Sequence, residues 1–213
     1  MGFEIKRVGV IGAGQMGNGI AHVCALAGYD VSLNDLSVER IQLGLATING
    51  NMTRQVNKGL VTEAARTAAL AHISAAENLD ALADCDLVVE AATEHEQVKR
   101  KIFQQLCPVL KPEALLATNT SSISITRLAA ATDRPEKFVG VHFMNPVPVM
   151  QLVELVRGIA TDDHTFDLCK AFVARLGKIS TVAEDFPAFI VNRILLPMIN
   201  EAIYTLYEGV GSV

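Results

Sequence analysis

The sequence has few cysteines for its 213 residues and no excess of basic residues. Its cysteines are widely spaced and form no C-x-x-C pair; they are Cys24, Cys85, Cys107 and Cys169. This spacing argues against a disulfide framework or a metal site, and it favours reduced, mostly buried thiols in a cytoplasmic protein. Lys and Arg total 18 and Asp and Glu total 23, and the net charge of −5 argues against a nucleic-acid-binding protein.

Long apolar runs are also missing. The sequence has no apolar stretch of about 18 residues, so we expect no membrane span. Lys6 stands where a signal peptide would begin its apolar region. Half of the residues are nevertheless hydrophobic, which is enough for a sizeable core. The length fits one large domain, or one domain with a small appendage.

Residues 6–28 carry the pattern of a dinucleotide-binding turn. Aliphatic residues typical of a buried strand come first, three glycines follow in G-x-G-x-x-G spacing, and a helical pattern then runs to Gly28. Gly12 fits the tight turn, Gly14 lets the backbone approach a pyrophosphate, and Gly17 lets the helix pack against the strand. The N-terminus of the helix then offers free N–H groups to the phosphates.

The second half of this pattern is a short alternating strand that ends at Asp35. An acidic residue about 20 positions after the first glycine binds the adenosine ribose hydroxyls. Its carboxylate would repel a 2′-phosphate, and no arginine is adjacent to neutralise that phosphate, so the pattern favours NAD over NADP. The alternative is a nucleotide-free α/β domain in which the glycine turn and Asp35 are incidental.

The rest of the chain alternates strand and helix patterns, which predicts an α/β fold with a Rossmann-like, doubly wound, mostly parallel sheet. A helical hairpin is inserted at about 38–71 and broken near Gly59. Its basic pair, Arg54 and Lys58, is either a solvated helix face or a clamp for the phosphates of a large substrate. The later predicted strands are 87–92, 115–117, 138–143, 151–156 and 180–182, and the later helices are 95–110, 125–131, 164–176 and 189–207.

Polar side chains occur where several predicted strands end, at the edge where open α/β sheets bind ligands. They are Glu94, Asn119, Ser121 and His142, with Glu154 near the end of its strand and Asn192 just inside the last helix. Singly, Ser121 could cap a helix, His142 could be a core histidine and Glu154 an edge-strand charge. Their convergence on one edge favours a site. A hydrolase triad is disfavoured, because the serine context NTSSI lacks the G-x-S-x-G elbow.

Five segments resemble the 3-hydroxyacyl-CoA dehydrogenase family, and within it the short-chain bacterial 3-hydroxybutyryl-CoA dehydrogenases. They are VGVIGAGQMGNGIA, DLVVEAATE, ATNTSSISIT, GVHFMNPVPVMQLVELV and FIVNRILLP, and they extend over nearly the whole chain. The resemblance implies an oxidoreductase that interconverts 3-hydroxyacyl-CoA and 3-oxoacyl-CoA by hydride transfer to NAD. One departure is Ala188, where the family usually has glycine. If this position needs a positive φ, alanine costs about 1 kcal/mol.

The resemblance also implies residue roles. His142 is the general base that takes the 3-hydroxyl proton, Glu154 pairs with it, and Ser121 and Asn192 hydrogen-bond the substrate's hydroxyl or carbonyl. Arg54 and Lys58 belong to the hairpin that carries the coenzyme A contacts. The residues expected to hold NAD are Gly12, Gly14, Gln15, Met16, Gly17, Asp35, Glu94, Lys99 and Asn119. A histidine suits this reaction because it exchanges protons near neutral pH.

By the same resemblance, 1–186 form the NAD-binding domain, and 187–213 begin an all-helical C-terminal domain that makes the full-length family members homodimers. The apolar residues of 189–207 cover more of the helix than one sheet face would bury. We therefore expect an incomplete chain that binds NADH, has weak or no dehydrogenase activity and tends to self-associate. Two other functions stay open: an NAD-dependent dehydrogenase of a free hydroxy acid or sugar acid, and a non-catalytic NAD-binding protein.

Overall fold

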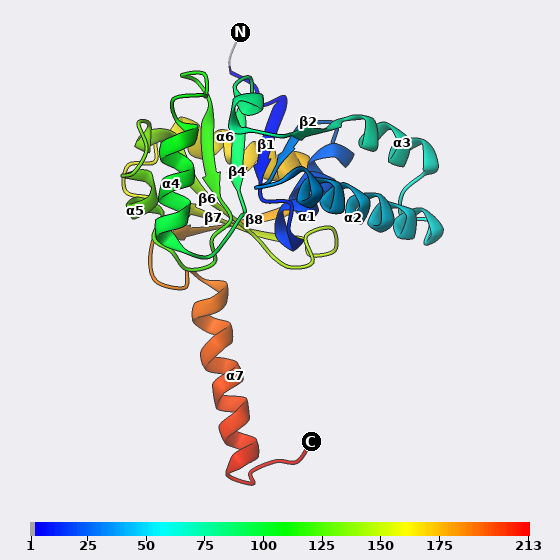
Figure 1. The fold of residues 1–213 in the computed structure, drawn as a ribbon. Helices are drawn as coiled ribbons and strands as arrows, with labels where there is room; N and C mark the ends of the chain where they lie inside the picture. The colour runs from blue at the N-terminus through cyan, green and yellow to red at the C-terminus, as the bar shows by residue number, and fades with distance from the viewer. Residues whose placement is uncertain (1–2) are drawn as a thin grey trace.

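The computed structural model describes residues 3–213 and contains an eight-stranded sheet with helices on both faces (Figure 1). The strands are β1 (Arg7–Ile11), β2 (Asp30–Asn34), β3 (Ile73–Ala76), β4 (Leu87–Glu90), β5 (Leu115–Thr118), β6 (Phe138–Phe143), β7 (Leu152–Arg157) and β8 (Ile179–Glu184). The helices are α1 (Gln15–Leu26), α2 (Val38–Asn57), α3 (Glu63–Ala71), α4 (Glu96–Leu106), α5 (Ile125–Ala129), α6 (Asp163–Arg175) and α7 (Val191–Tyr207), with short 3-10 helices η1 (Leu79–Leu82) and η2 (Pro135–Lys137).

The strand order is β3-β2-β1-β4-β5-β6-β7-β8, and this order confirms the predicted Rossmann-like fold. The strands from β1 to β6 are parallel, β7 runs antiparallel to β6, and β8 runs parallel to β7. One face of the sheet packs on α1, α2 and α6, and the other packs on η1, α4 and α5. Strands β4, β5 and β6 are buried along their whole length, as parallel strands covered on both faces must be.

The inserted hairpin is present as α2 and α3, and Gly59 between them has a φ of +70°. The sequence did not predict β3, which follows the hairpin and lies parallel to β2 at the edge of the sheet. This strand has four residues, and only Ala76 is buried. It therefore lacks the apolar alternation that identifies a strand in a sequence.

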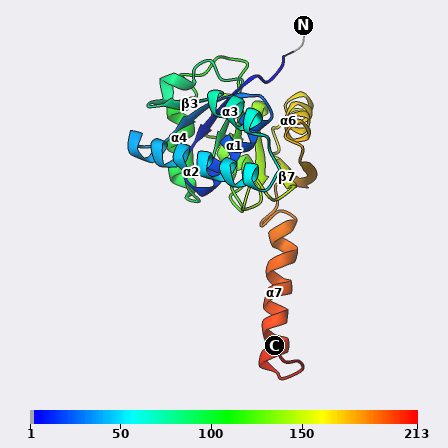
Figure 2. The same ribbon diagram turned by 90° about the vertical axis from the view of Figure 1, so that its right-hand side faces the viewer.

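Helix α7 projects away from the rest of the molecule (Figures 1 and 2), and every one of its residues is at least partly exposed. It carries a set of exposed large apolar side chains: Ile194, Leu195, Leu196, Met198, Ile199, Ile203 and Leu206. It starts at Val191 and not at Phe189 as predicted. The reason is that Ala188 and Phe189 have φ values of 66° and 49°, which no right-handed helix can include.

Ala188 has a positive φ of 66°, a backbone conformation that is strained for alanine. We expect Ala188→Gly to stabilise the fold by about 1 kcal/mol, because glycine adopts a positive φ without steric cost. The measurement is thermal unfolding, in which Tm should rise by about 2–4 °C for a chain of this size. Ala171→Gly, at an exposed position inside α6, is the matched control and should lower stability by a similar amount. Equal shifts of the same sign would contradict the assignment of strain to Ala188.

All four cysteines are buried and free, as the sequence predicted. Burial raises the pKa of the Cys85 thiol to about 11 and that of Cys169 to about 12, so both thiols are uncharged at neutral pH. Among residues 3–213, no helix is long and apolar enough to cross a membrane. The same residues contain no group of three or more His, Cys, Asp or Glu side chains that could hold a metal ion.

Candidate active site

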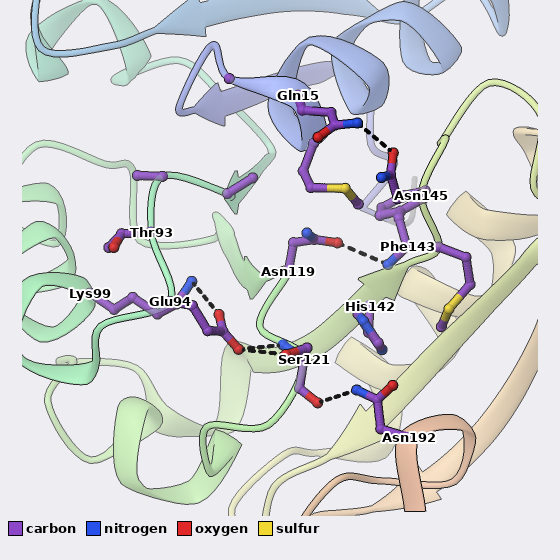
Figure 3. Close-up of a pocket in the computed structure, with 15 residues that line it drawn as sticks. Gln15, Thr93, Glu94, Lys99, Asn119, Ser121, His142, Phe143, Asn145 and Asn192 are labelled. Atoms are coloured by element: carbon purple, nitrogen blue, oxygen red, sulfur yellow. Dashed lines mark hydrogen bonds and ion pairs between the residues drawn. The ribbon is translucent and has the colours of Figure 1, made fainter. Parts of the chain in front are cut away.

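A cleft of about 480 Å³ opens where the parallel strands end, beside the glycine turn and the first residues of α7 (Figure 3). Nine predicted site residues line it: Gly14, Gln15, Met16, Glu94, Lys99, Asn119, Ser121, His142 and Asn192. The other predicted residues lie elsewhere. Gly12 and Gly17 are inside the turn, Asp35 lines a neighbouring cavity, Glu154 is buried behind His142, and Arg54 and Lys58 line a separate groove.

The glycine turn has the shape that a pyrophosphate needs. A Cβ on Gly17 would lie 1.6 Å from the carbonyl oxygen of Gly12, so only glycine lets α1 approach the turn this closely. Gly12 itself has a φ of +100°, and its Cβ would lie 2.7 Å from the carbonyl oxygen of Ala91. Gly14, by contrast, faces open space at the start of α1, where the first N–H groups of the helix are free. The residues present therefore fit NAD, because a side chain at Gly14 would fill the space left for its phosphates.

Asp35 follows β2 and shares a small cavity with apolar side chains such as Ile11 and Leu79, which suits a flat base. Its carboxylate accepts the N–H groups of Ala13 and Leu36, both at 2.7 Å, and so fastens the glycine turn to the end of β2. Nη1 of Arg40 lies 3.7 Å from Asp35 Oδ1. No arginine follows Asp35 directly in the sequence, but the expectation that none lies beside it is wrong. The first turn of α2 brings Arg40 back towards Asp35.

His142 and Glu154 form a buried pair at the back of the cleft. Nδ1 of His142 lies 2.7 Å from Oε2 of Glu154, and Oε1 of Glu154 accepts the N–H groups of Ile190 at 3.0 Å and Val191 at 2.8 Å. Burial raises the pKa of Glu154, but the hydrogen bonds from His142 and the two backbone groups outweigh it and hold the pKa below its usual value. The carboxylate is therefore ionised and fixes the ring through Nδ1, which leaves Nε2 to exchange a proton in the cleft.

The position of Glu154 within its strand differs from the expectation. It is the third residue of β7 and does not lie near the end of that strand. The pairing still occurs at one edge because β7 runs antiparallel to β6, with His142 directly opposite Glu154 in the register. The start of β7 therefore meets the end of β6, a direction that the alternation of the sequence does not reveal.

Glu94 organises the loop that follows β5. Its Oε1 accepts the hydroxyl of Thr120 at 2.7 Å, and the N–H and hydroxyl of Ser121 at 2.7 and 2.9 Å. Burial raises the pKa of Glu94, but these hydrogen bonds and the ammonium of Lys99 outweigh it and lower the pKa. Ser121 thus donates its hydroxyl proton to Glu94 and keeps its oxygen as an acceptor for the cleft. It is not a helix cap, since Ser124 caps α5.

Four side-chain amides complete the polar lining. Asn119 accepts the N–H of Phe143 at 2.9 Å through Oδ1, which leaves its NH₂ group for the cleft. Asn192, the second residue of α7, donates to the carbonyl oxygen of Ser121 at 3.4 Å, and Gln15 donates to Asn145 at 3.2 Å. The cleft therefore joins one histidine, a serine oxygen and several amides beside a turn that fits a dinucleotide.

Arg54 and Lys58 line a groove between α2 and the turn at 146–149. A neighbouring hollow shares Asn51, Pro146 and Pro148 with this groove, and it shares Gly14, Gln15 and Asn145 with the cleft. A surface path thus leads from the basic pair to His142. The sequence could not predict this path, because it depends on how α2 and the turn at 146–149 pack together.

Sequence reasoning missed Glu90 and Arg40. Glu90 is fully buried and pairs with Lys99 at 2.5 Å, although its segment reads as a nearly apolar strand. A charge inside a strand predicted to be buried on both faces was the signal available for Glu90, since a buried charge needs a partner. Arg40 carried no such signal, because only the fold brings it beside Asp35.

Comparison with known proteins matches residues 7–186 to the family model described as "3-hydroxyacyl-CoA dehydrogenase, NAD binding domain". The chain is 74% identical over its full 213 residues to the 3-hydroxybutyryl-CoA dehydrogenase of Bradyrhizobium diazoefficiens, and it covers 73% of that protein. It is 44% identical over 208 residues to a probable 3-hydroxybutyryl-CoA dehydrogenase of Bacillus subtilis, covering 98% of this chain and 72% of the relative.

Among solved structures, the (S)-3-hydroxybutyryl-CoA dehydrogenase of Ralstonia eutropha superposes with a TM-score of 0.95 at 47% identity, covering 98% of this chain and 74% of the other. A dinucleotide turn, a paired histidine in the adjoining cleft and these similarities agree. The chain belongs to the 3-hydroxyacyl-CoA dehydrogenase family and carries its NAD-binding domain.

Proposed function

We propose that this NAD-dependent oxidoreductase interconverts 3-hydroxybutyryl-CoA and acetoacetyl-CoA, with His142 as the general base. The observation that carries the proposal is the His142–Glu154 pair, which lies in the same cleft as a glycine turn that fits NAD. The names of the similar proteins supply the substrate class. Oxidising a secondary alcohol requires removal of a proton from oxygen and of a hydride from carbon. The protein has to supply only the first, together with the geometry for the second.

In the oxidation, Nε2 of His142 takes the 3-hydroxyl proton while the C3–H bond breaks and the C3–O bond becomes a carbonyl. Bound NAD supplies the hydride acceptor. The ionised Glu154 stabilises the imidazolium that forms, and in the reduction His142 returns the proton to the new alkoxide. Ser121 and Asn192 would hold the reacting oxygen, Asn192 through its second amide N–H and Ser121 once its hydroxyl proton turns from Glu94 to that oxygen. A positioned base of this kind contributes about 10²–10⁴-fold in rate.

In this proposal, Arg54 and Lys58 bind the phosphates of the coenzyme A part of the substrate. Arg54 in the last turn of α2 and Lys58 directly after the helix are positive groups at the far end of the path from the cleft, where phosphates would be neutralised. Between them and His142 the path is lined by small or uncharged residues such as Gly19, Thr47 and Asn145, over which an uncharged linker can lie. Glu94, Lys99 and Asn119 belong in this scheme to the ribose and nicotinamide end of NAD.

The test is NADH oxidation with acetoacetyl-CoA, longer 3-oxoacyl-CoA thioesters and free acetoacetate, with NADH binding followed in parallel by its fluorescence. We expect weak but measurable oxidation with the thioesters and less still with the free acid. Faster turnover of free acetoacetate or a sugar acid would favour the dehydrogenase of a free acid. NADH binding without oxidation of any of these substrates would favour a non-catalytic NAD-binding protein.

We further propose that 1–186 form the NAD-binding unit, and that α7 belongs to a helical unit through which the protein forms a homodimer in the cytoplasm. The exposed apolar side chains of α7 support this assignment, because a helix apolar around most of its surface is normally covered. Light-scattering mass measured against concentration tests the association. A monomer at every concentration would contradict it.

Asp35 should control the choice between NADH and NADPH. Replacing it with serine removes the like charge that opposes a 2′-phosphate, and Arg40 is then within reach of that phosphate. We expect the ratio of kcat/KM for NADPH over NADH to rise by about 10–100-fold, equal to about 1.4–2.8 kcal/mol. Asp35→Ser/Arg40→Ala should lose most of the gain in NADPH use. An unchanged NADH preference in Asp35→Ser would remove Asp35 from the specificity of this site.

A further inference from the structure

A buried charged cluster lies behind the wall of the cleft. The side chains of Glu90 and Lys99 are 0% and 1% exposed, respectively, and Lys99 Nζ donates to Glu90 Oε2 at 2.5 Å. The same carboxylate oxygen accepts the hydroxyl of Thr118 at 2.9 Å, and Glu90 Oε1 accepts the N–H of Ala92 at 2.9 Å. One carboxylate therefore fastens the end of β4, the loop after it, α4 and the end of β5.

These contacts fix the direction of the Lys99 ammonium. Because Thr118 donates its hydroxyl proton to Glu90, its oxygen is left to accept from Lys99, at 3.3 Å. With Glu90 as the other buried partner, two of the three N–H groups of Lys99 are assigned. The third is on the cleft side, where Glu94 Oε2 lies 3.9 Å away (Figure 3). Glu94 in turn holds Ser121 through its other oxygen.

Stability alone is a weak reason for this arrangement. Taking two charges out of water is costly, and replacing a buried ion pair by apolar residues of similar volume is often neutral or stabilising. We propose that Glu90 is a positioning residue for the cofactor site. It holds the Lys99 ammonium in the cleft wall so that the free N–H reaches the hydroxyl-bearing part of bound NAD and Glu94. The inference rests on the proposed role of Lys99 in NAD binding, and it extends that role to a residue that does not line the cleft.

The experiment compares Glu90→Gln, Lys99→Met and the double variant by NADH titration, followed as the change in NADH fluorescence, with thermal unfolding alongside. Losing one hydrogen bond to a charged group corresponds to about tenfold or more in affinity. We expect each single variant to bind NADH at least about tenfold more weakly, and the double variant no more weakly than Lys99→Met. In steady state, Glu90→Gln should raise KM for NADH and leave KM for the acyl thioester unchanged.

Asp185→Asn is the matched control, since this carboxylate also accepts several hydrogen bonds, from Ser124, Ile125 and Thr126, but only fastens α5. It should lower Tm and leave NADH affinity unchanged. Glu90 has a purely structural role if Glu90→Gln behaves in the same way, or if it costs the same factor in the Lys99→Met background. Should Glu90→Gln fail to fold, Thr118→Val replaces it in the cycle and must show the same dependence on Lys99.

These results are separable from the proposed reaction. NADH binding needs no acyl substrate, so the cycle can be completed even if no thioester is turned over. Absence of dehydrogenase activity with an intact Glu90–Lys99 dependence would overturn the proposed substrate alone. Normal activity with no such dependence would overturn the role of Glu90 alone.

Discussion

Replacing His142 with glutamine should lower kcat for thioester reduction by about 10²–10⁴-fold, which is the usual contribution of a positioned acid or base. Glutamine keeps the polarity of the site but cannot carry the proton. Glu154→Gln should also lower kcat substantially, because a neutral amide no longer stabilises the imidazolium across the 2.7 Å contact. NADH affinity should stay nearly constant in Glu154→Gln, since Glu154 is fully buried behind the histidine.

The double variant decides whether these residues act as a pair. If they do, His142→Gln/Glu154→Gln should be about as slow as His142→Gln alone, because Glu154 has no imidazolium left to stabilise. A double variant that loses the product of the two single losses would show independent action. Tm must be measured for each protein, since Glu154 also holds the N–H groups of Ile190 and Val191.

Two alanine substitutions in the glycine turn should have opposite consequences. In Gly17→Ala the new Cβ would lie 1.6 Å from the Gly12 carbonyl oxygen, so α1 must move away from the turn. Overpacking usually costs about 1–3 kcal/mol, and a clash with rigid backbone falls at the upper end or beyond. We expect Gly17→Ala to lower Tm by several degrees or to prevent folding. In Gly14→Ala the Cβ enters open space, so stability should fall by only about 0.5–1 kcal/mol, the usual disadvantage of alanine at an N-cap.

The affinity for NADH should be affected more by Gly14→Ala than by Gly17→Ala in any molecules that fold. The space at Gly14 is where the pyrophosphate approaches the backbone, so Gly14→Ala should weaken NADH binding by about tenfold or more while the fold stays intact. Circular dichroism, thermal unfolding and NADH titration of both variants separate the two effects. Normal NADH affinity in a well-folded Gly14→Ala protein would place the phosphates elsewhere.

The fold was predictable where local patterns are strong. The helix after the glycine turn has an apolar face at i, i+3, i+4 and i+7, and the short, β-branched apolar run at 87–90 has the length of a buried strand. Strand β3 was not predictable, because its four residues pair with β2 but bury little. The reversal at β7 was also hidden, since alternation along a strand is the same in either direction.

The sequence allowed us to predict which residues belong to the site, but not which side chains contact one another. Residues such as His142 and Ser121 could be placed at one edge because carboxyl ends of parallel strands meet there. The partners of Lys99 could not, because its ammonium reaches a carboxylate in β4 from a different element, α4. Arg40 approaches Asp35 only through the turn into α2. Contacts between elements depend on three-dimensional packing that a single sequence does not display.

The carboxylate of Glu154 connects the start of α7 to the imidazole of His142. Oε1 accepts the N–H groups of Ile190 and Val191, where α7 begins, and Oε2 contacts Nδ1 of His142. The orientation of the helix at its first residues and the orientation of the ring therefore depend on the same planar carboxylate. Seventeen residues give an arm of about 25 Å. A displacement of about 2.5 Å at its far end corresponds to a rotation of roughly 6° at the pivot. The start of α7 and the catalytic imidazole are therefore hydrogen-bonded to the same carboxylate, so a contact that holds α7 also acts on the group that orients His142.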